Sequence, residues 1–74
     1  MKNERLQNHL ELLRHNGLAV TLYWSDGQNG VVADGYDNVG ALVLSARGSS
    51  RKDALARLID QAKYRRPELL ERAV

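Results

Sequence analysis

The sequence predicts an α+β domain of order α-β-β-β-α, with a three-stranded antiparallel sheet and a short C-terminal helical tail. Two segments place apolar residues at helical spacing, and three short segments between them have the pattern of strands. Turn-forming pairs that contain glycine or aspartate connect these segments, so we expect an antiparallel meander. Both helices should cover one face of the sheet, because a two-layer arrangement buries the apolar side of every element.

The chain has 74 residues, enough for one small domain, which we assign to residues 1–66 with a tail over 67–74. The first helix is expected over residues 4–15. Asn16-Gly17 then supplies a residue suited to the left-handed conformation that ends a helix, and Leu18 can pack back on the last turn. Three leucines at positions i, i+4 and i+7 form its apolar stripe: Leu6, Leu10 and Leu13.

The three strands are expected over residues 18–24, 30–36 and 41–46. The first alternates apolar and polar residues and should bury one face, which places Trp24 in the core. Residues 25–30 contain Asp-Gly and Asn-Gly, a strong hairpin signal because both pairs tolerate positive φ. The second connection lies around Asp37-Asn38.

The second helix is expected from Ser50 to about Tyr64. Ser50 and Asp53 have capping-box spacing, with the hydroxyl accepting from the Asp53 amide and the carboxylate reaching back. Pro67 disfavours helical geometry before it and can start a short terminal helix. We expect one core, formed by residues of both helices and of the first and third strands: Leu10, Leu13, Val20, Leu22, Leu42, Leu44, Leu55, Leu58 and Ile59.

The sequence gives little support to catalysis. It has no cysteine, no glycine-rich phosphate loop and only two histidines, and His9 and His15 are six residues apart, too poorly aligned on a helix to chelate one ion. Asp26, Asp34 and Asp37 are expected in or near turns, where aspartate commonly bonds its own backbone, and this structural role is favoured over a catalytic pair. We therefore predict a protein that is not an enzyme and that uses no metal and no cofactor.

Charge is unevenly distributed although the formal net charge is only +2. Residues 18–46 carry three acids and no base, a charge of −3, whereas residues 47–66 carry seven bases and two acids, a charge of +5. Such a concentration of positive charge attracts phosphates or acidic protein surfaces, although a solvated helix face explains it equally well. The lack of cysteine suits the cytoplasm, and no apolar stretch is long enough for a membrane segment.

The entry to the second helix is the most informative segment. Residues 48–52 place hydroxyls, free amides and two cations at a helix N-terminus, which favours anions. Capping explains Ser50 and Asp53. It does not explain Arg51 and Lys52, which oppose the helix dipole.

Residues 39–54 resemble the third strand and second-helix entry of double-stranded-RNA-binding domains, whose pattern ends in Gly, Ser, paired Lys and Ala. The resemblance implies that Arg51 and Lys52 grip phosphates across the major groove, and that Glu11 lies at a minor groove near ribose hydroxyls. It also implies recognition of duplex shape and 2′-hydroxyls. The residues expected to bind nucleic acid or a partner are these: Glu11, Arg47, Ser50, Arg51, Lys52 and Arg57.

A second class of function stays open. The chain departs from the family pattern at Leu55, where a third Lys is usual, and in residues 25–30, and it also resembles HicB-like antitoxins through Asp53-Ala54-Leu55. The alternative is a small regulatory protein of phage or toxin-antitoxin type that inhibits a host protein, such as the transcription machinery. It would use the basic helix, the acidic sheet edge or an exposed pair of Tyr23 and Tyr36. The sequence leaves monomer and homodimer open.

Overall fold

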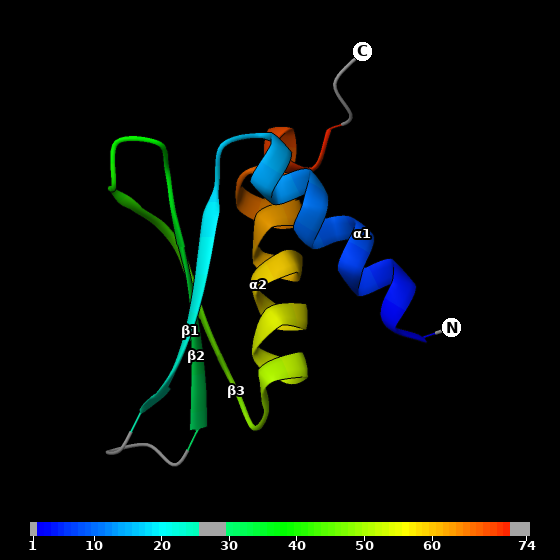
Figure 1. The fold of residues 1–74 in the computed structure, drawn as a ribbon, viewed down its shortest axis with the longest axis vertical. Helices are drawn as coiled ribbons and strands as arrows, with labels where there is room; N and C mark the ends of the chain where they lie inside the picture. Colours follow the sequence, from blue (N-terminus) through cyan, green and yellow to red (C-terminus); the bar gives the residue numbers. More distant parts are fainter. Residues whose placement is uncertain (1, 26–29, 72–74) are drawn as a thin grey trace.

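The computed structural model describes residues 2–25 and 30–71 and confirms the α+β class and the α-β-β-β-α order (Figure 1). The helices are α1 (Lys2–His15), α2 (Arg51–Arg65) and a terminal 3₁₀ turn, η1 (Pro67–Leu70). The strands are β1 (Ala19–Ser25), β2 (Gly30–Tyr36) and β3 (Leu42–Gly48). Strand β2 has the bounds expected from the sequence. Strand β1 begins and ends one residue later than expected, and β3 begins one residue later and ends two residues later.

The sheet is the expected antiparallel meander, with β2 between β1 and β3. The register divides the β2 side chains between two faces. Val31, Ala33 and Gly35 face the helices, and Val32, Asp34 and Tyr36 lie on the opposite side, which we call the outer face. The register also places Tyr23 on the outer face with Tyr36, as expected.

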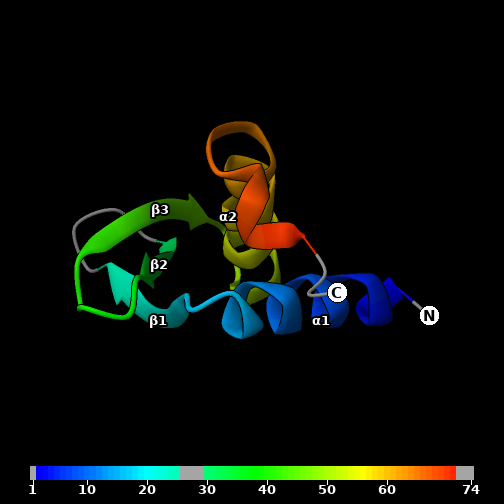
Figure 2. The ribbon, with the colours of Figure 1, turned by 90° about the horizontal axis from the view of Figure 1, so that it is seen from above.

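Both helices lie on one side of the sheet, but they cover it unequally (Figure 2). Helix α2 packs on β3 and β2, whereas α1 contacts α2, η1 and only the adjacent strand β1. The turn η1 packs back against both helices, and Leu69 joins the core. Strand β1 is therefore the part of the helix-facing side that receives least cover.

Four of the nine expected core residues are buried: Leu13, Leu44, Leu58 and Ile59. Leu10, Val20 and Leu55 are half-buried and pack against that core. The core also contains six buried residues besides those nine, three of them alanines: Leu18, Val31, Ala33, Ala54, Ala62 and Leu69. Small residues let the helix and the sheet approach closely. At Gly35 an added Cβ would lie 2.8 Å from Leu18 Cδ2.

The other two of the nine, Leu22 and Leu42, are instead exposed, and so is Trp24, which the alternation of the first strand also placed in the core. Trp24 is 68% exposed and Leu22 37%, because they belong to the poorly covered strand β1. Leu42 is 57% exposed because the register between β2 and β3 shifts at Gly35/Tyr36, which sets Leu42 opposite Tyr36 on the outer face. Alternation alone cannot reveal an irregularity of this kind.

The end of α1 follows the expected pattern and adds a clamp. Gly17 has φ 91°, the Leu18 amide donates to Leu13 O at 2.9 Å, and the Gly17 amide donates to Arg14 O at 3.0 Å. These two bonds form a Schellman motif. The Asn16 Nδ2 group also donates to three carbonyls, of Leu12, Leu69 and Glu71, at 2.8 to 2.9 Å, and so ties η1 to α1.

Of the two predicted loops, only the second is described. Asp37 Oδ1 accepts from the amides of Val39 and Ala41 at 3.0 and 2.9 Å, as expected of an aspartate in a turn. Gly40 in the same turn has a φ of 86°. Residues 26–29 of the first hairpin lie outside the described residues, but the flanking Ser25 and Gly30 pair.

Candidate nucleic-acid interface

Gly48 allows β3 to run directly into α2. A Cβ added there would lie 2.7 Å from the Asp53 carbonyl carbon and would collide with the Ala54 amide nitrogen. Only a residue without a side chain fits this approach of two backbones. The first turn of α2 is thereby fixed against the end of the sheet, and Ser49 and Ser50 form the link.

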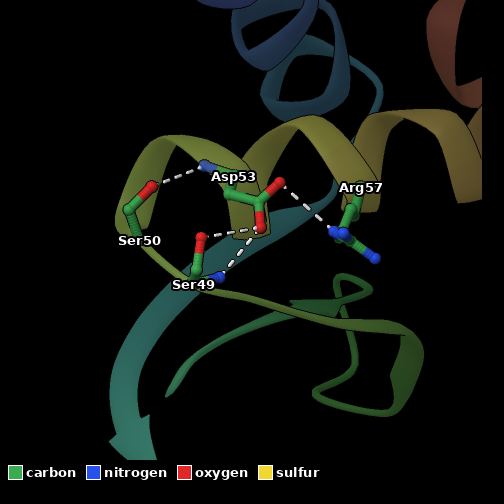
Figure 3. A network of polar contacts seen from close by, with 4 residues as sticks. All are labelled: Ser49, Ser50, Asp53 and Arg57. Carbon is green, nitrogen blue, oxygen red and sulfur yellow. Dashed lines mark hydrogen bonds and ion pairs between the residues drawn. The ribbon is translucent and has the colours of Figure 1, made fainter. Parts of the chain in front are cut away.

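Ser50 and Asp53 cap α2 together, with one change from the expected box (Figure 3). Ser50 Oγ accepts from the Asp53 amide at 3.1 Å, as expected. The Asp53 carboxylate, however, accepts from the amide and hydroxyl of Ser49, at 2.8 and 3.2 Å, rather than from Ser50. Gly48 packs against the backbone of Asp53 and Ala54, so its neighbour Ser49 lies next to the start of the helix.

Asp53 also holds Arg57, whose Nε donates to Asp53 Oδ1 at 3.2 Å. The hydrogen bond from the Ser49 backbone, followed by the one from Arg57, lowers the pKa of Asp53. The carboxylate is therefore ionised at neutral pH and places a negative charge from the chain itself at the positive end of α2.

Arg51 and Lys52 take no part in this network. Both side chains are exposed, and neither forms an ion pair or hydrogen bond with another side chain of residues 5–25 or 30–71. Lys52 lines a groove of about 220 Å³ between the two helices, in which bases outnumber the single acid Asp60. The basic members of this groove are Arg5, His9, Lys52 and Lys63.

The six candidate residues do not form one cluster. Ser50, Arg51, Lys52 and Arg57 share the first two turns of α2. Glu11 is exposed on α1 and lines a different groove, of about 320 Å³, between α1, β1 and Leu55 of α2. Arg47 pairs with Val32 in the sheet, so it lies on the outer face, away from the helices.

The sequence analysis missed a polar cluster on the outer face, centred on Asp34. Asp34 lies within β2, not in a turn, and is 5% exposed. Its two oxygens accept from Ser45 Oγ at 2.6 Å and from Tyr36 OH at 3.4 Å. Partial desolvation, and then the nearby Asp34 carboxylate, raise the pKa of Tyr23. The polar residues Thr21 and Ser45, which pair with Asp34, were the available signal.

Residues 2–25 and 30–71 offer neither a cluster of metal ligands nor a helix that could cross a membrane. Three or more potential metal ligands come together nowhere in these ranges. None of their helices has the length and apolar character required to cross a bilayer. Comparisons with models of known families, with curated proteins and with solved structures gave no match to this chain.

Proposed function

We propose that this chain is a non-catalytic module that binds the backbone of duplex RNA through the first turn of α2. The observation that carries the proposal is that Arg51 and Lys52 are exposed cations at a helix start whose capping is complete without them. Two cations at this position oppose the helix dipole, so stability does not account for them. Binding to phosphate does.

The surroundings of the two cations support phosphate binding. Arg57 engages Asp53 through Nε, and its side chain is still 64% exposed, which leaves the rest of the guanidinium facing solvent. Lys52 adjoins the basic groove with Arg5 and Lys63. The resemblance of residues 39–54 to double-stranded-RNA-binding domains favours RNA among the duplexes, with the 2′-hydroxyl as the distinguishing group.

The test is a fluorescence titration with an RNA duplex of about 20 base pairs, slightly longer than the roughly 16 that such domains span. Affinity should fall steeply with salt, because each neutralised phosphate adds about −0.9 to the log-log slope in the B-DNA reference case. The double variant Arg51→Ala, Lys52→Ala should lose most of the binding and flatten that slope by about 2.

The matched control is Arg65→Ala with Arg66→Ala, which removes two exposed cations from the C-terminal end of the same helix, outside the basic groove. It should retain binding far better than the first double variant. Equal losses in the two variants would mean that only net charge matters. Absence of binding near about 10 µM at low salt would refute the proposal, given that non-specific duplex binding alone commonly reaches about 1 to 100 µM.

A second candidate function is the inhibition or regulation of another protein, and the outer face favours it. Tyr23 is 51% and Leu42 57% exposed there, on either side of the Asp34 cluster. Exposed aromatic side chains such as tyrosine are enriched in protein interfaces. A pull-down from lysate with nuclease present distinguishes this function: capture of one protein that the variant Tyr23→Ala loses would favour it over RNA binding.

A further inference from the structure

The two edges of the sheet differ in how they are protected. On β3, the outward amide of Ser45 donates to Gln61 Oε1 of α2 at 3.0 Å, and the strand carries both a register shift and Arg47. Such features prevent an edge strand from pairing with another chain. Strand β1 has seven residues in unbroken register with β2, and none of them is charged or is proline.

Among the described residues, no side chain forms a hydrogen bond with the backbone of β1. The strand therefore presents a straight row of backbone donors and acceptors at the edge of the sheet, beside exposed apolar side chains. An edge with these properties readily adds a further strand.

We propose that two copies of this chain pair antiparallel through β1 and form a twofold-symmetric dimer with one continuous sheet. The axis passes beside Leu22, the middle residue of β1. Leu22 then faces Leu22 of the second copy, Trp24 faces Val20, and Tyr23 faces Thr21. Every pair on the helix-facing side is apolar, and the absence of charge lets identical strands meet without repulsion.

The groove beside β1 fits the same arrangement. Gln7, Glu11 and Arg14 are the polar residues of its lining. The other five are aliphatic: Leu10, Leu18, Val20, Leu22 and Leu55. Because Trp24 of one copy lies opposite Val20 of the other, its indole comes to the mouth of that groove. An exposed aromatic residue and the groove that receives it thus lie on one edge, as a self-complementary interface requires. This is why a second copy, rather than a foreign strand, is the partner that we infer.

The oligomeric state of the full chain tests the proposal and does not depend on RNA binding. Light scattering coupled to gel filtration, from low to high micromolar concentration, should show a mass that approaches twice 8.3 kDa. Leu22→Glu puts two like charges opposite each other at the axis and should yield a monomer at all concentrations. Leu42→Glu, the same substitution on the opposite edge strand, is the matched control and should leave the dimer intact.

Single cysteines in this cysteine-free chain test the register directly. Opposed residues of an antiparallel pair have Cα atoms about 4.5 to 5.5 Å apart, inside the range of roughly 4.4 to 6.8 Å that disulfides span. Leu22→Cys should therefore form a covalent dimer on mild oxidation. Tyr23→Cys should not, because its Cα lies about 8 Å from its own copy.

Three results would overturn the proposal. The first is a monomeric wild type at high micromolar concentration. The second is a dimer that persists in folded Leu22→Glu, with folding checked by circular dichroism. The third is a covalent dimer that forms from Tyr23→Cys or Leu42→Cys as efficiently as from Leu22→Cys. If Leu22→Glu does not fold, the cysteine comparison alone decides.

Discussion

The end of α1 and the beginning of α2 are both junctions between a helix and a strand, but they use their polar residues differently. At the end of α1, Asn16 donates to three carbonyls and the Schellman bonds satisfy the last turn. At the beginning of α2, Ser50 and Asp53 complete the cap. Two further residues, Arg51 and Lys52, form no ion pair or hydrogen bond with a side chain of residues 5–25 or 30–71.

On the proposal that α2 binds RNA, this difference separates a structural junction from one that also binds a ligand. Where a basic residue agrees with the helix dipole, as Arg14 does in the last turn of α1, stability explains the sequence. Where charged residues remain after the helix end is satisfied, and where they lie against the helix dipole, a ligand outside the chain explains them better. The comparison therefore predicts that changes at the α1 junction affect stability alone, whereas changes at the α2 junction divide into stability and binding.

The largest effect is expected where both junctions lose their support at once. Leu58 of α2 is fully buried in the core against which both helices pack. Leu58→Ala should lower the free energy of unfolding by about 2 to 5 kcal/mol, comparable with the whole stability of a small domain. Thermal unfolding by circular dichroism measures it. A melting temperature within two degrees of the wild type would contradict this packing of α2.

The fold could be predicted because local signals agreed with one another. Asn16-Gly17, Ser50 with Asp53, and Asp37 mark chain turns through their own hydrogen bonds, which need no knowledge of tertiary structure. The alternation in β1 was also correct about direction, since Val20, Leu22 and Trp24 do share one face. It could not show that α2 covers β2 and β3 and leaves Trp24 exposed.

The candidate site was only partly predictable for a similar reason. Residues on one helix turn, such as Arg51 and Lys52, lie together whatever the rest of the fold does. The position of Glu11 depends on how α1 packs against the rest of the fold, and the face on which Arg47 lies depends on the register of β3. Both are long-range properties. Asp34 falls in the strand expected over residues 30–36, but its role was predicted to be that of an aspartate near a turn. Its buried hydrogen bond to the cross-strand partner Ser45 depends on the register between β2 and β3.

The next largest losses of stability are expected from substituting one glycine at each junction, Gly17 at the end of α1 and Gly48 before α2. Gly48→Ala brings a Cβ against the backbone of Asp53 and Ala54, and overpacking of this kind costs about 1 to 3 kcal/mol. Gly17→Ala meets no atom within 4 Å, but its φ of 91° costs about 1 to 2 kcal/mol for a residue with a side chain.

Substitution by asparagine distinguishes the two causes. Gly17→Asn should recover part of the loss, since asparagine tolerates the left-handed conformation, whereas Gly48→Asn should not. Chemical denaturation of the four variants provides the measurement. Recovery at Gly48 would show that steric contact with α2 is not the cause there.

A smaller effect is expected from the clamp of the α1 junction. Asn16→Ala removes the donor to the carbonyls of Leu69 and Glu71 and should lower stability by about 1 to 2 kcal/mol. Asn16→Asp should cost more at neutral pH, because a carboxylate would face carbonyl oxygens. RNA affinity, titrated where each variant is fully folded, should not change. A loss of affinity in folded Asn16→Ala would remove the distinction between the two junctions.

The smallest effect isolates the stabilising part of the α2 junction through pH. Bonds from Ser49 and then Arg57 lower the pKa of Asp53 in the folded chain. Because the pKa is lower in the folded chain, the ionised carboxylate stabilises the fold at any pH above the unfolded-state pKa of about 3.9. This contribution disappears as the pH falls through the pKa of the folded state. Between pH 7 and pH 3 the melting temperature of Asp53→Asn should therefore fall less than that of the wild type.

Asp60→Asn, which removes an equal charge from the same helix, is the control. If Asp53→Asn and Asp60→Asn follow the same pH profile, the Asp53 network adds no stability of its own, and the cap of α2 rests on Ser50 alone.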